Sequence, residues 1–549
     1  METPETRDGH DIEADNALRA AEAFDPGEEP SPEPSPGRIA RSTAFFSIAT
    51  AASRVAGLVR EIVAASYYGV TGPMSAFTIA FQVPNLVRAL FADAALQPAF
   101  VPIFTEQLEK KNYREAFRLA STLLLLVTLV LGAITALFVL AAPVIMPIVA
   151  PGFEGEILDL TITLSQVLFP ILILLGVSGV VVGVLNSYDR FGAFAISPLF
   201  WNLTIILLVV ALAPMFEGQD RIYAYAIGIL VGTLVQLLIP AFDLRNTPFK
   251  FEWSFEWRNR DVRRVLLLML PVTISLGLIN FNLIINSLFA TLVSDQAPAA
   301  IDKAFRIYQL PQGSVSVAIA TVLFPTRARF AARGEHNNLR ATMANGMRQI
   351  LFVLVPAAAA VLVLSDPMIR LVYQRGEFTP EQTALVATAL FWFAFSLPAN
   401  GLFLLLTRTF FSLQRPWVPT GIAAANLAVT ALAALGLYHL GVGGIVAATA
   451  IATVASVVVQ GVILRRMLDG LELGRLLDTG IRITIAAAAL AAVSFGIWDL
   501  LDNALGRGLF GQIVSLGAGL GLGGLVYVGA ARLLHIAELE QIMRLVRRR

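Results

Sequence analysis

The feature that most constrains this chain is a series of long apolar runs that continues from residue 43 almost to the C-terminus. A helix needs roughly 20 apolar residues to cross the hydrocarbon core of a bilayer, and a helix satisfies its own backbone hydrogen bonds in lipid. Only 14% of the 549 residues are charged, against about 25% in soluble domains. The sequence therefore predicts an all-α integral membrane protein with about 14 transmembrane helices, centred near residues 55, 88, 132, 172, 204, 231, 277, 315, 356, 396, 426, 453, 489 and 521.

The basic residues between these runs predict how the chain is threaded. If the N-terminus is cytoplasmic, the six inner loops hold twenty-two Lys and Arg residues. The seven outer loops then hold four: Arg221, Lys303, Arg375 and Arg507. This bias is what the positive-inside rule requires. We therefore expect both termini to be cytoplasmic.

Residues 1–42 differ in composition from everything that follows. They hold eleven acidic residues and the run PGEEPSPEPSPG. Such a composition cannot bury enough apolar surface to fold. We expect a disordered acidic cytoplasmic tail.

Two stretches of the chain look alike and indicate an internal duplication. FVPIFT, which contains Pro102, and VLFPT, which contains Pro325, each precede a polar stretch and a long apolar run. Gly152 lies fifty residues after Pro102, and Gly376 lies fifty-one residues after Pro325. Because six helices separate the copies, the halves would share one orientation as a parallel repeat, with chance similarity as the alternative. The expected parts are a first six-helix bundle at 43–246, a second at 261–470, and two additional transmembrane helices with the basic C-terminus at 471–549.

Ionisable residues occur inside the apolar runs, where each costs about 2.5–3.5 kcal/mol on insertion scales. Six of them lie in the first, second and eighth runs: Arg54, Arg60, Glu61, Arg88, Asp93 and Arg306. Arg54 and Glu61 are seven residues apart and share one helix face. Four arginines against two carboxylates leave a surplus of positive charge, and arginine suits bidentate contact with phosphate. The pattern favours a cavity for an anionic, phosphate-bearing substrate.

Two structural explanations of these charges stay open. One is a set of ion pairs between helices, such as Arg60 with Asp93, and the other is snorkelling of arginines to the interface. Amide side chains supply further candidates to line a cavity, although hydrogen bonds between helices also explain them. These candidates are Asn85, Asn282, Asn286 and Gln309.

Several kinds of chemistry are not expected. The chain has no cysteine and its four histidines are scattered, so we expect neither a disulfide nor a metal site. GLGLGG at 519–524 lies in an apolar run with no strand before it, so it does not indicate dinucleotide binding. Neither a Walker motif nor a nucleophile–base pair occurs in a catalytic context. We therefore expect a transporter rather than an enzyme, without a cofactor and without a nucleic-acid partner.

Five motifs that occur in order along the chain resemble the MurJ/MviN family: SRVAGLVREIVAA, VPNLVRALFADAALQPAFVPIFTE, APGF, NSYDRFG and QRGEFT. The resemblance implies a flippase of the bacterial cytoplasmic membrane that moves lipid II from the cytoplasmic to the outer leaflet by alternating access. It also implies that the two additional helices form a groove for the polyprenyl tail. By the same resemblance, pyrophosphate and headgroup contacts fall on Arg54, Arg60, Glu61, Arg88, Asp93 and Arg306. The chain departs from the family pattern at Ser75, where an acidic residue is usual, and at Ala89, where a second arginine is usual.

Other functions remain open at this point. An exporter of another polyprenyl-linked oligosaccharide, or a cation-coupled drug antiporter of the same superfamily, would share the fold. A membrane scaffold that recruits cell-wall synthesis proteins through residues 1–42 is a further alternative. The expected partners are lipid II and membrane lipids. Uphill transport would need membrane potential or an ion gradient, and the sequence identifies no ion site.

Overall fold

The computed structural model describes residues 36–91, 96–312, 333, 335–468, 470 and 472–541. Within these residues the regular structure is helical and contains no strand, which confirms the all-α prediction. The first half consists of α2 (Pro36–Tyr68), α3 (Gly72–Phe91), α4 (Leu96–Glu109), α5 (Tyr113–Val149), α6 (Gly155–Leu168), α7 (Ile171–Ser187), α8 (Gly192–Leu212) and α9 (Ile222–Asp243).

The second half continues the same architecture. Its helices are α10 (Arg260–Val293), the helical segment 297–312, α12 (His336–Tyr373), α13 (Pro380–Ser412), α14 (Trp417–Leu437) and α15 (Val442–Met467), followed by α16 (Leu473–Leu505) and α17 (Leu509–Leu533). Short 3-10 turns lie at Ala213–Met215, Gly218–Arg221, Leu244–Asn246 and Tyr438–Leu440.

The chain is a multi-pass membrane protein. Ten helices within the described residues are long and apolar enough to cross a membrane. The other four expected spans fall on α2, on α3 with α4, on α10 and on the segment that begins at residue 297. Since each of these carries internal charges or runs into undescribed residues, the count of fourteen stays a prediction.

One expected boundary needs correction. Helix α2 begins at Pro36, so the helical part of the chain starts before the predicted end of the tail at residue 42. Residues 36–42 read PGRIARS and carry two arginines and no acidic residue. Proline is well tolerated in the first turn of a helix, so the helix can start there. Residues 1–35 lie outside the described part of the chain.

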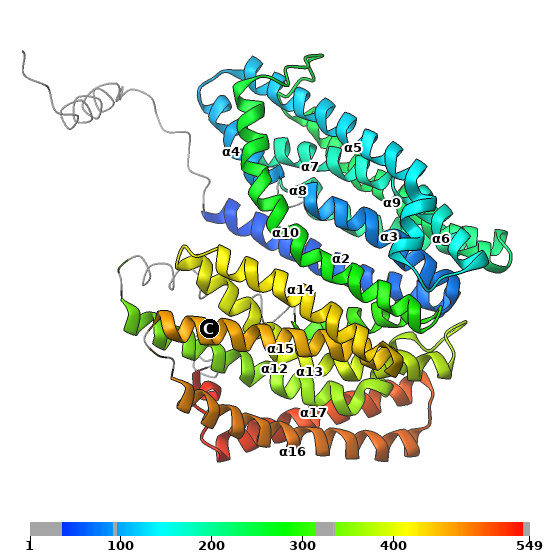
Figure 1. Cartoon of the computed structure of the whole chain (residues 1–549), viewed down its shortest axis with the longest axis vertical. Helices are drawn as coiled ribbons and strands as arrows, with labels where there is room; N and C mark the ends of the chain where they lie inside the picture. Colours follow the sequence, from blue (N-terminus) through cyan, green and yellow to red (C-terminus); the bar gives the residue numbers. More distant parts are fainter. Residues whose placement is uncertain are drawn as a thin grey trace, which may run out of the picture.

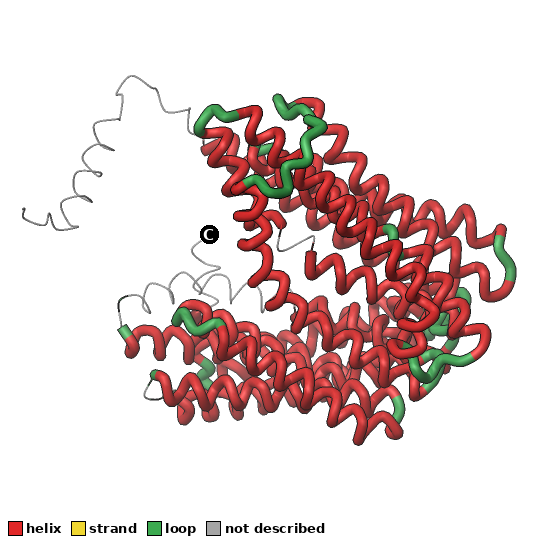
Figure 2. The backbone as a smooth tube through the Cα atoms, turned by 45° about the horizontal axis from the view of Figure 1, so that its top comes forward, coloured by secondary structure: helices red, strands yellow, loops and turns green. Residues whose placement is uncertain are grey.

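The helices form two groups with α10 between them (Figure 1). Helix α10 packs against α3, α4 and α5 on one side and against α14 and α15 on the other. Helices α16 and α17 pack on α12, on the side away from the first half (Figure 1). The two groups lie close together at one end and diverge toward the other (Figure 2).

Two glycines at matching places in the two halves are each in close contact with the other half, as a duplication predicts. Gly152 follows α5, and a Cβ built on it would lie 2.1 Å from the carbonyl oxygen of Thr291 near the end of α10. Gly376 follows α12, and its Cβ would lie 2.2 Å from the carbonyl oxygen of Ser66 near the end of α2. Each half thus packs a glycine turn against the first helix of the other half. The repeat itself stays a prediction.

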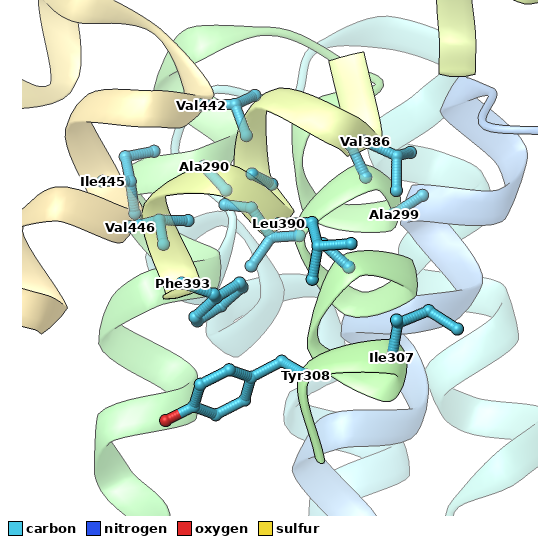
Figure 3. Packing of buried hydrophobic residues seen from close by; sticks show 14 of the residues in the cluster. Ala290, Ala299, Ile307, Tyr308, Val386, Leu390, Phe393, Val442, Ile445 and Val446 are labelled. Atoms are coloured by element: carbon cyan, nitrogen blue, oxygen red, sulfur yellow. The ribbon is translucent and has the colours of Figure 1, made fainter. Parts of the chain in front are cut away.

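The largest apolar core runs through both halves and ties the bundle together. It includes Ala64 and Phe77 from the first half and many residues of the second. In Figure 3, Leu390 and Phe393 of α13 lie between Ile307 of the segment 297–312 and Ile445 of α15. The same core holds Ala64 of α2 together with Ala304 and Ile307 of the segment 297–312, and this packing brings together the charged residues described next.

Candidate functional site

The two halves are joined at the end of the bundle where α2 and α12 both finish. Glu377 N donates a hydrogen bond to Ser66 O at 2.9 Å, and Val70 N donates one to Gln382 Oε1 at 2.8 Å. Arg221 and Glu377 form an ion pair at 3.5 Å. We call this the closed end of the bundle, because backbone and side chains of both halves meet there directly.

Ser75 adds a further contact at the closed end. It is fully buried, and Ala299 N donates a hydrogen bond to its Oγ at 3.1 Å. This is the position at which the sequence departs from the family pattern. An uncharged hydroxyl joins the halves here, so the contact does not require a carboxylate.

A buried charge cluster lies beside the closed end and is centred on Glu61 of α2. Arg60 Nη2 donates to Glu61 Oε1 at 2.6 Å, and Lys303 Nζ donates to Glu61 Oε2 at 2.8 Å. Arg306 Nη1 lies 3.8 Å from Glu61 Oε1, and Arg306 Nε lies 3.4 Å from Asp302 Oδ2. Three cations therefore face two carboxylates, and the cluster carries a surplus of one positive charge. This agrees in sign with the surplus predicted from the sequence.

Lys303 is the member of this cluster that sequence reasoning missed. We expected it in an outer loop, but it lies in the helical segment 297–312 with its side chain completely buried. Its ammonium group also lies 5.7 Å from the ring centroid of Tyr373. The error arose because SDQAPAAIDK before Arg306 is too polar to read as part of a span. The usable signal was helical spacing, since Asp302, Lys303 and Arg306 fall within one turn.

Arg60 faces the interior rather than the membrane surface. It is only 7% exposed, and its guanidinium lies 4.6 Å from the ring centroid of Trp201. Its observed carboxylate partner is Glu61, the next residue in the chain. The pairing of Arg60 with Asp93 remains untested, since Asp93 lies outside the described residues. Arg88 belongs to α3, but its side chain also lies outside the description.

The cluster opens onto a cavity of about 520 Å³ between the halves. Arg60, Glu61 and Arg306 line it, as do two of the predicted amide residues, Asn85 and Gln309. Lys303 is not among the lining residues, so it approaches Glu61 from the protein side. The two arginines therefore face open space while the lysine is held in the protein.

Arg54 was predicted to belong to the same site, but it lies elsewhere. Its side chain is exposed, and it does not belong to the described lining of the cavity. Successive residues of an α-helix are turned by about 100°, so Arg54 lies at the edge of the arc of α2 that faces the cavity through Gly57, Arg60 and Glu61. The neighbouring Ser53 does line the cavity. Arg54 is therefore placed beside the mouth of the cavity rather than within the charge cluster.

A second cavity of about 390 Å³ adjoins the first and extends into the second half. The two share Gln82, Asp302, Phe305 and Gln309 as lining residues. The second is lined mainly by uncharged polar and aromatic side chains, including Asn286, Gln312, Phe393, Asn400, Asn426, Thr449 and Thr453. Asn286 thus borders this cavity, and Thr449 Oγ1 donates a hydrogen bond to its Oδ1 at 3.0 Å. The side chain of Asn282 lies outside the description.

Helices α16 and α17 are fastened to α12 at several points. Arg348 of α12 donates to Glu538 at 2.7 Å, Tyr527 donates to the carbonyl of Phe352 at 2.6 Å, and Arg370 pairs with Asp502. The glycines of GLGLGG divide between two faces of α17. Gly519 and Gly523 pack against α16, whereas Cβ atoms built on Gly521 and Gly524, and on Gly517 just before the motif, would meet open space. One face of α17 is thus a close-packed contact and the other is smooth and unfilled.

Comparison with known proteins agrees with this geometry. The family model described as lipid II flippase MurJ matches residues 64–513. A probable lipid II flippase MurJ of Rhizobium meliloti is 35% identical over 463 residues, which cover 82% of this chain and 85% of the relative. One of Bdellovibrio bacteriovorus is 27% identical over 92% of this chain and 97% of its own length.

Solved structures show the same fold. A lipid II flippase MurJ in an inward closed conformation superposes with a TM-score of 0.74 and 20% identity, covering 90% of this chain and 99% of that one. An inward-facing multidrug resistance transporter of the MATE family gives 0.62 and 16% identity, over 76% and 94% of the two chains. The solved structures show the fold, while the match to the family model and the 35% identity to the Rhizobium meliloti protein place the chain in the MurJ family.

Proposed function

We propose that this protein moves lipid II from the cytoplasmic to the outer leaflet of the bacterial inner membrane by alternating access. The observation that carries the proposal is the cavity whose wall holds Arg60 and Arg306 around Glu61, close to an end where the halves are joined. Lipid II carries a pyrophosphate, and the guanidinium groups of buried Arg60 and partly exposed Arg306 are suited to bind it in bidentate fashion. Membership of the MurJ family supports the same substrate.

In this mechanism the arginines exchange partners when substrate enters. Arg60 and Arg306 leave Glu61 and bind phosphate oxygens, while Lys303 retains the Glu61 carboxylate. The exchange avoids an unpaired buried charge, which would be costly. Arg54 at the mouth would contact the headgroup first, and Arg88 and Asp93 would complete the set by the family resemblance.

The second cavity is proposed to take the sugar and peptide part of the headgroup. Its amides and hydroxyls offer paired hydrogen-bond donors and acceptors, and Phe305 and Phe393 offer flat apolar faces. The smooth face of α17 is proposed as the groove for the polyprenyl tail. The charged and uncharged parts of the substrate would thus bind in adjoining spaces.

The orientation follows from the charge rule rather than from geometry. With both termini cytoplasmic, α2 runs outward, the closed end faces the outer side, and the cavity opens to the cytoplasm. A ligand shifts the equilibrium between the inward-open and outward-open states only by the difference in its affinity for them. Net uphill transport therefore draws on membrane potential or an ion gradient, and one charge moving across 100 mV supplies about 2.3 kcal/mol.

The direct test is depletion of the protein followed by analysis of lipid-linked intermediates in purified membranes. Lipid II should accumulate in the cytoplasmic leaflet. Accumulation of a different polyprenyl-linked oligosaccharide would assign the chain to that export pathway, and unchanged lipid pools with altered drug export would favour an antiporter. The TM-scores above and the match to the MurJ family model favour the first outcome over the drug antiporter.

A point variant then assigns the site. Arg306→Ala should fail to support growth of a strain depleted of its own flippase, at unchanged protein level in the membrane. Arg475→Ala is the matched control, because Arg475 is an exposed arginine of α16, which packs on α12 on the side away from the first half (Figure 1). Full growth of the Arg306→Ala strain would reduce the cluster to a structural ion-pair network.

If the protein is instead a membrane scaffold, its acidic tail would recruit proteins of cell-wall synthesis as partners. Deletion of residues 1–35 separates the two functions. A flippase keeps its transport activity without the tail, whereas a scaffold loses its role in growth.

A further inference from the structure

The connection between α9 and α10 has an unusual alternation of side chains. Residues 250–257 read KFEWSFEW and lie outside regular secondary structure, with a turn beginning at Trp257. The four aromatic side chains all point outward: Phe251, Trp253, Phe255 and Trp257 are 42%, 88%, 48% and 51% exposed. The residues between them are half-buried. We call residues 250–257 the aromatic strap.

The inward side of the strap is polar and is fastened to α5. Glu252 N donates to Ser121 Oγ at 3.0 Å, and Thr122 Oγ1 donates to Ser254 O at 3.1 Å. Arg118 pairs with Glu252 at 3.3 Å and with Glu256 at 3.5 Å. The strap is therefore held in one register, and its aromatic face is fixed outward by these bonds.

The surface around the strap is strongly cationic. Its carboxylates have partners within the protein: Glu252 and Glu256 pair with Arg118, and Asp261 accepts a hydrogen bond from Gln107 at 2.7 Å. Of the nearby cations, Arg264 pairs with Glu106 at 2.9 Å. The basic residues point outward, and two of the guanidiniums lie over aromatic rings, at 4.7 and 4.8 Å from the centroids. The exposed cations of residues 245–264 are Arg245, Lys250, Arg258, Arg260, Arg263 and Arg264.

The strap lies at the depth where a bilayer changes from headgroups to acyl chains. It contacts residues 118–122, in the first turns of α5. Helix α5 has 37 residues, so it is about 55 Å long, whereas the hydrocarbon core is about 30 Å thick. The first turns of α5 therefore extend into the headgroup region. Aromatic side chains favour this boundary, and cations beside it attract anionic headgroups.

We propose that the aromatic strap and its flanking arginines form a binding surface for anionic glycerophospholipids at the membrane boundary. The aromatic rings insert below the headgroups, and the cations bind the lipid phosphates. An outward row of aromatic residues would be unfavourable in water, but it is favourable at this boundary. The surface is separate from the central cavity and does not depend on the proposed function.

The first experiment measures the depth of the strap in a bilayer. Because the chain has no cysteine, Phe255→Cys can carry a single nitroxide in the full chain within nanodiscs. The label should be accessible to oxygen and protected from a water-soluble nickel complex. A label at Asn337→Cys, which is exposed in a polar stretch, is the aqueous reference. Equal accessibility of the two labels to nickel would overturn the proposal.

The same label distinguishes lipid from a second copy of the chain. Protection should be identical in nanodiscs that hold one copy and in vesicles that hold many. Protection that occurs only in vesicles would replace the lipid with a protein contact and would overturn the proposal.

The second experiment tests the preference for anionic lipid. Spin-labelled phosphatidylglycerol should associate with the protein more strongly than spin-labelled phosphatidylcholine. The double variant Arg258→Gln and Arg260→Gln should reduce this preference by up to about fivefold for each charge removed. Arg375→Gln with Arg507→Gln removes the same charge from the opposite edge and should leave the preference unchanged. Equal effects of the two variants, or none, would overturn the assignment to the strap.

Discussion

Arg60 donates a hydrogen bond to one oxygen of the Glu61 carboxylate and Lys303 donates one to the other. The positions of these two cations indicate different roles. Arg60 borders the cavity, whereas Lys303 is completely buried on the protein side. Removing one partner of a buried pair leaves an uncompensated charge and costs about 3–5 kcal/mol, less where a second partner remains. Lys303→Met should therefore lower lipid II translocation in proteoliposomes by at least about tenfold, the effect of roughly 1.4 kcal/mol on a rate. Lys303→Arg should keep part of the activity because it keeps the charge.

A double variant tests whether Lys303 acts through Glu61. Glu61→Gln removes the carboxylate that Lys303 holds, so adding Lys303→Met to it should cost little more, and thermal unfolding should show the same coupling. Additive losses in activity and in stability would mean that Lys303 acts independently of Glu61. Wild-type translocation by Lys303→Met alone would remove it from the site.

The residue scale also shows how far sequence reasoning reached. It identified Arg60, Glu61 and Arg306 because charges in apolar runs stand out, and the structure brings these three together. It missed Lys303 because local polarity hid a helix that only tertiary packing explains. It placed Arg54 close to the helix face of Glu61 but could not predict how wide an arc of α2 faces the cavity. Helical periodicity gives the angle between two side chains, whereas the width of the arc that faces a cavity depends on how the neighbouring helices pack.

At the scale of elements, the glycine turns after α5 and α12 control the contact between the halves. Gly152→Ala would place a methyl group 2.1 Å from the carbonyl oxygen of Thr291. Such overpacking costs about 1–3 kcal/mol, which shifts a two-state equilibrium by roughly 5- to 150-fold. We expect the closed end to open, measured as a longer distance between nitroxides at Glu217→Cys and Glu381→Cys.

The control for this variant is Gly508→Ala. Gly508 also lies in a turn before a helix, at φ −65°, and a Cβ there would meet nothing within 4 Å. It should leave the distance distribution unchanged. An unaltered distribution in Gly152→Ala would mean that the turn relaxes without moving the halves.

The apolar runs predicted where spans are centred, but they did not predict where each helix begins and ends. The ten helices that qualify as spans correspond to ten of the expected centres. The four others coincide with the charged or amide-rich segments α2, α3 with α4, α10 and 297–312. These are also the segments that contribute Arg60, Asn85, Asn286 and Lys303 to the site or its surroundings. The segments that build the cavity are therefore those that carry polar or charged side chains within an apolar run, or that continue into residues outside the described part of the chain.

At the scale of the whole molecule, alternating access requires the closed end to open in every cycle. Ser66 and Glu377 meet there through a backbone hydrogen bond of 2.9 Å, and the chain has no cysteine of its own. Cross-linking Ser66→Cys to Glu377→Cys should therefore abolish lipid II translocation, because the outer side could no longer open, and reduction should restore it. Gln349→Cys with Gln541→Cys joins α12 to the segment after α17, where the amides are 3.1 Å apart. Both of these positions lie on the same side of the molecule, so this cross-link should leave translocation intact. Full translocation by the cross-linked Ser66–Glu377 pair would mean that the halves do not separate at this end, and the alternating-access mechanism would fail for this protein.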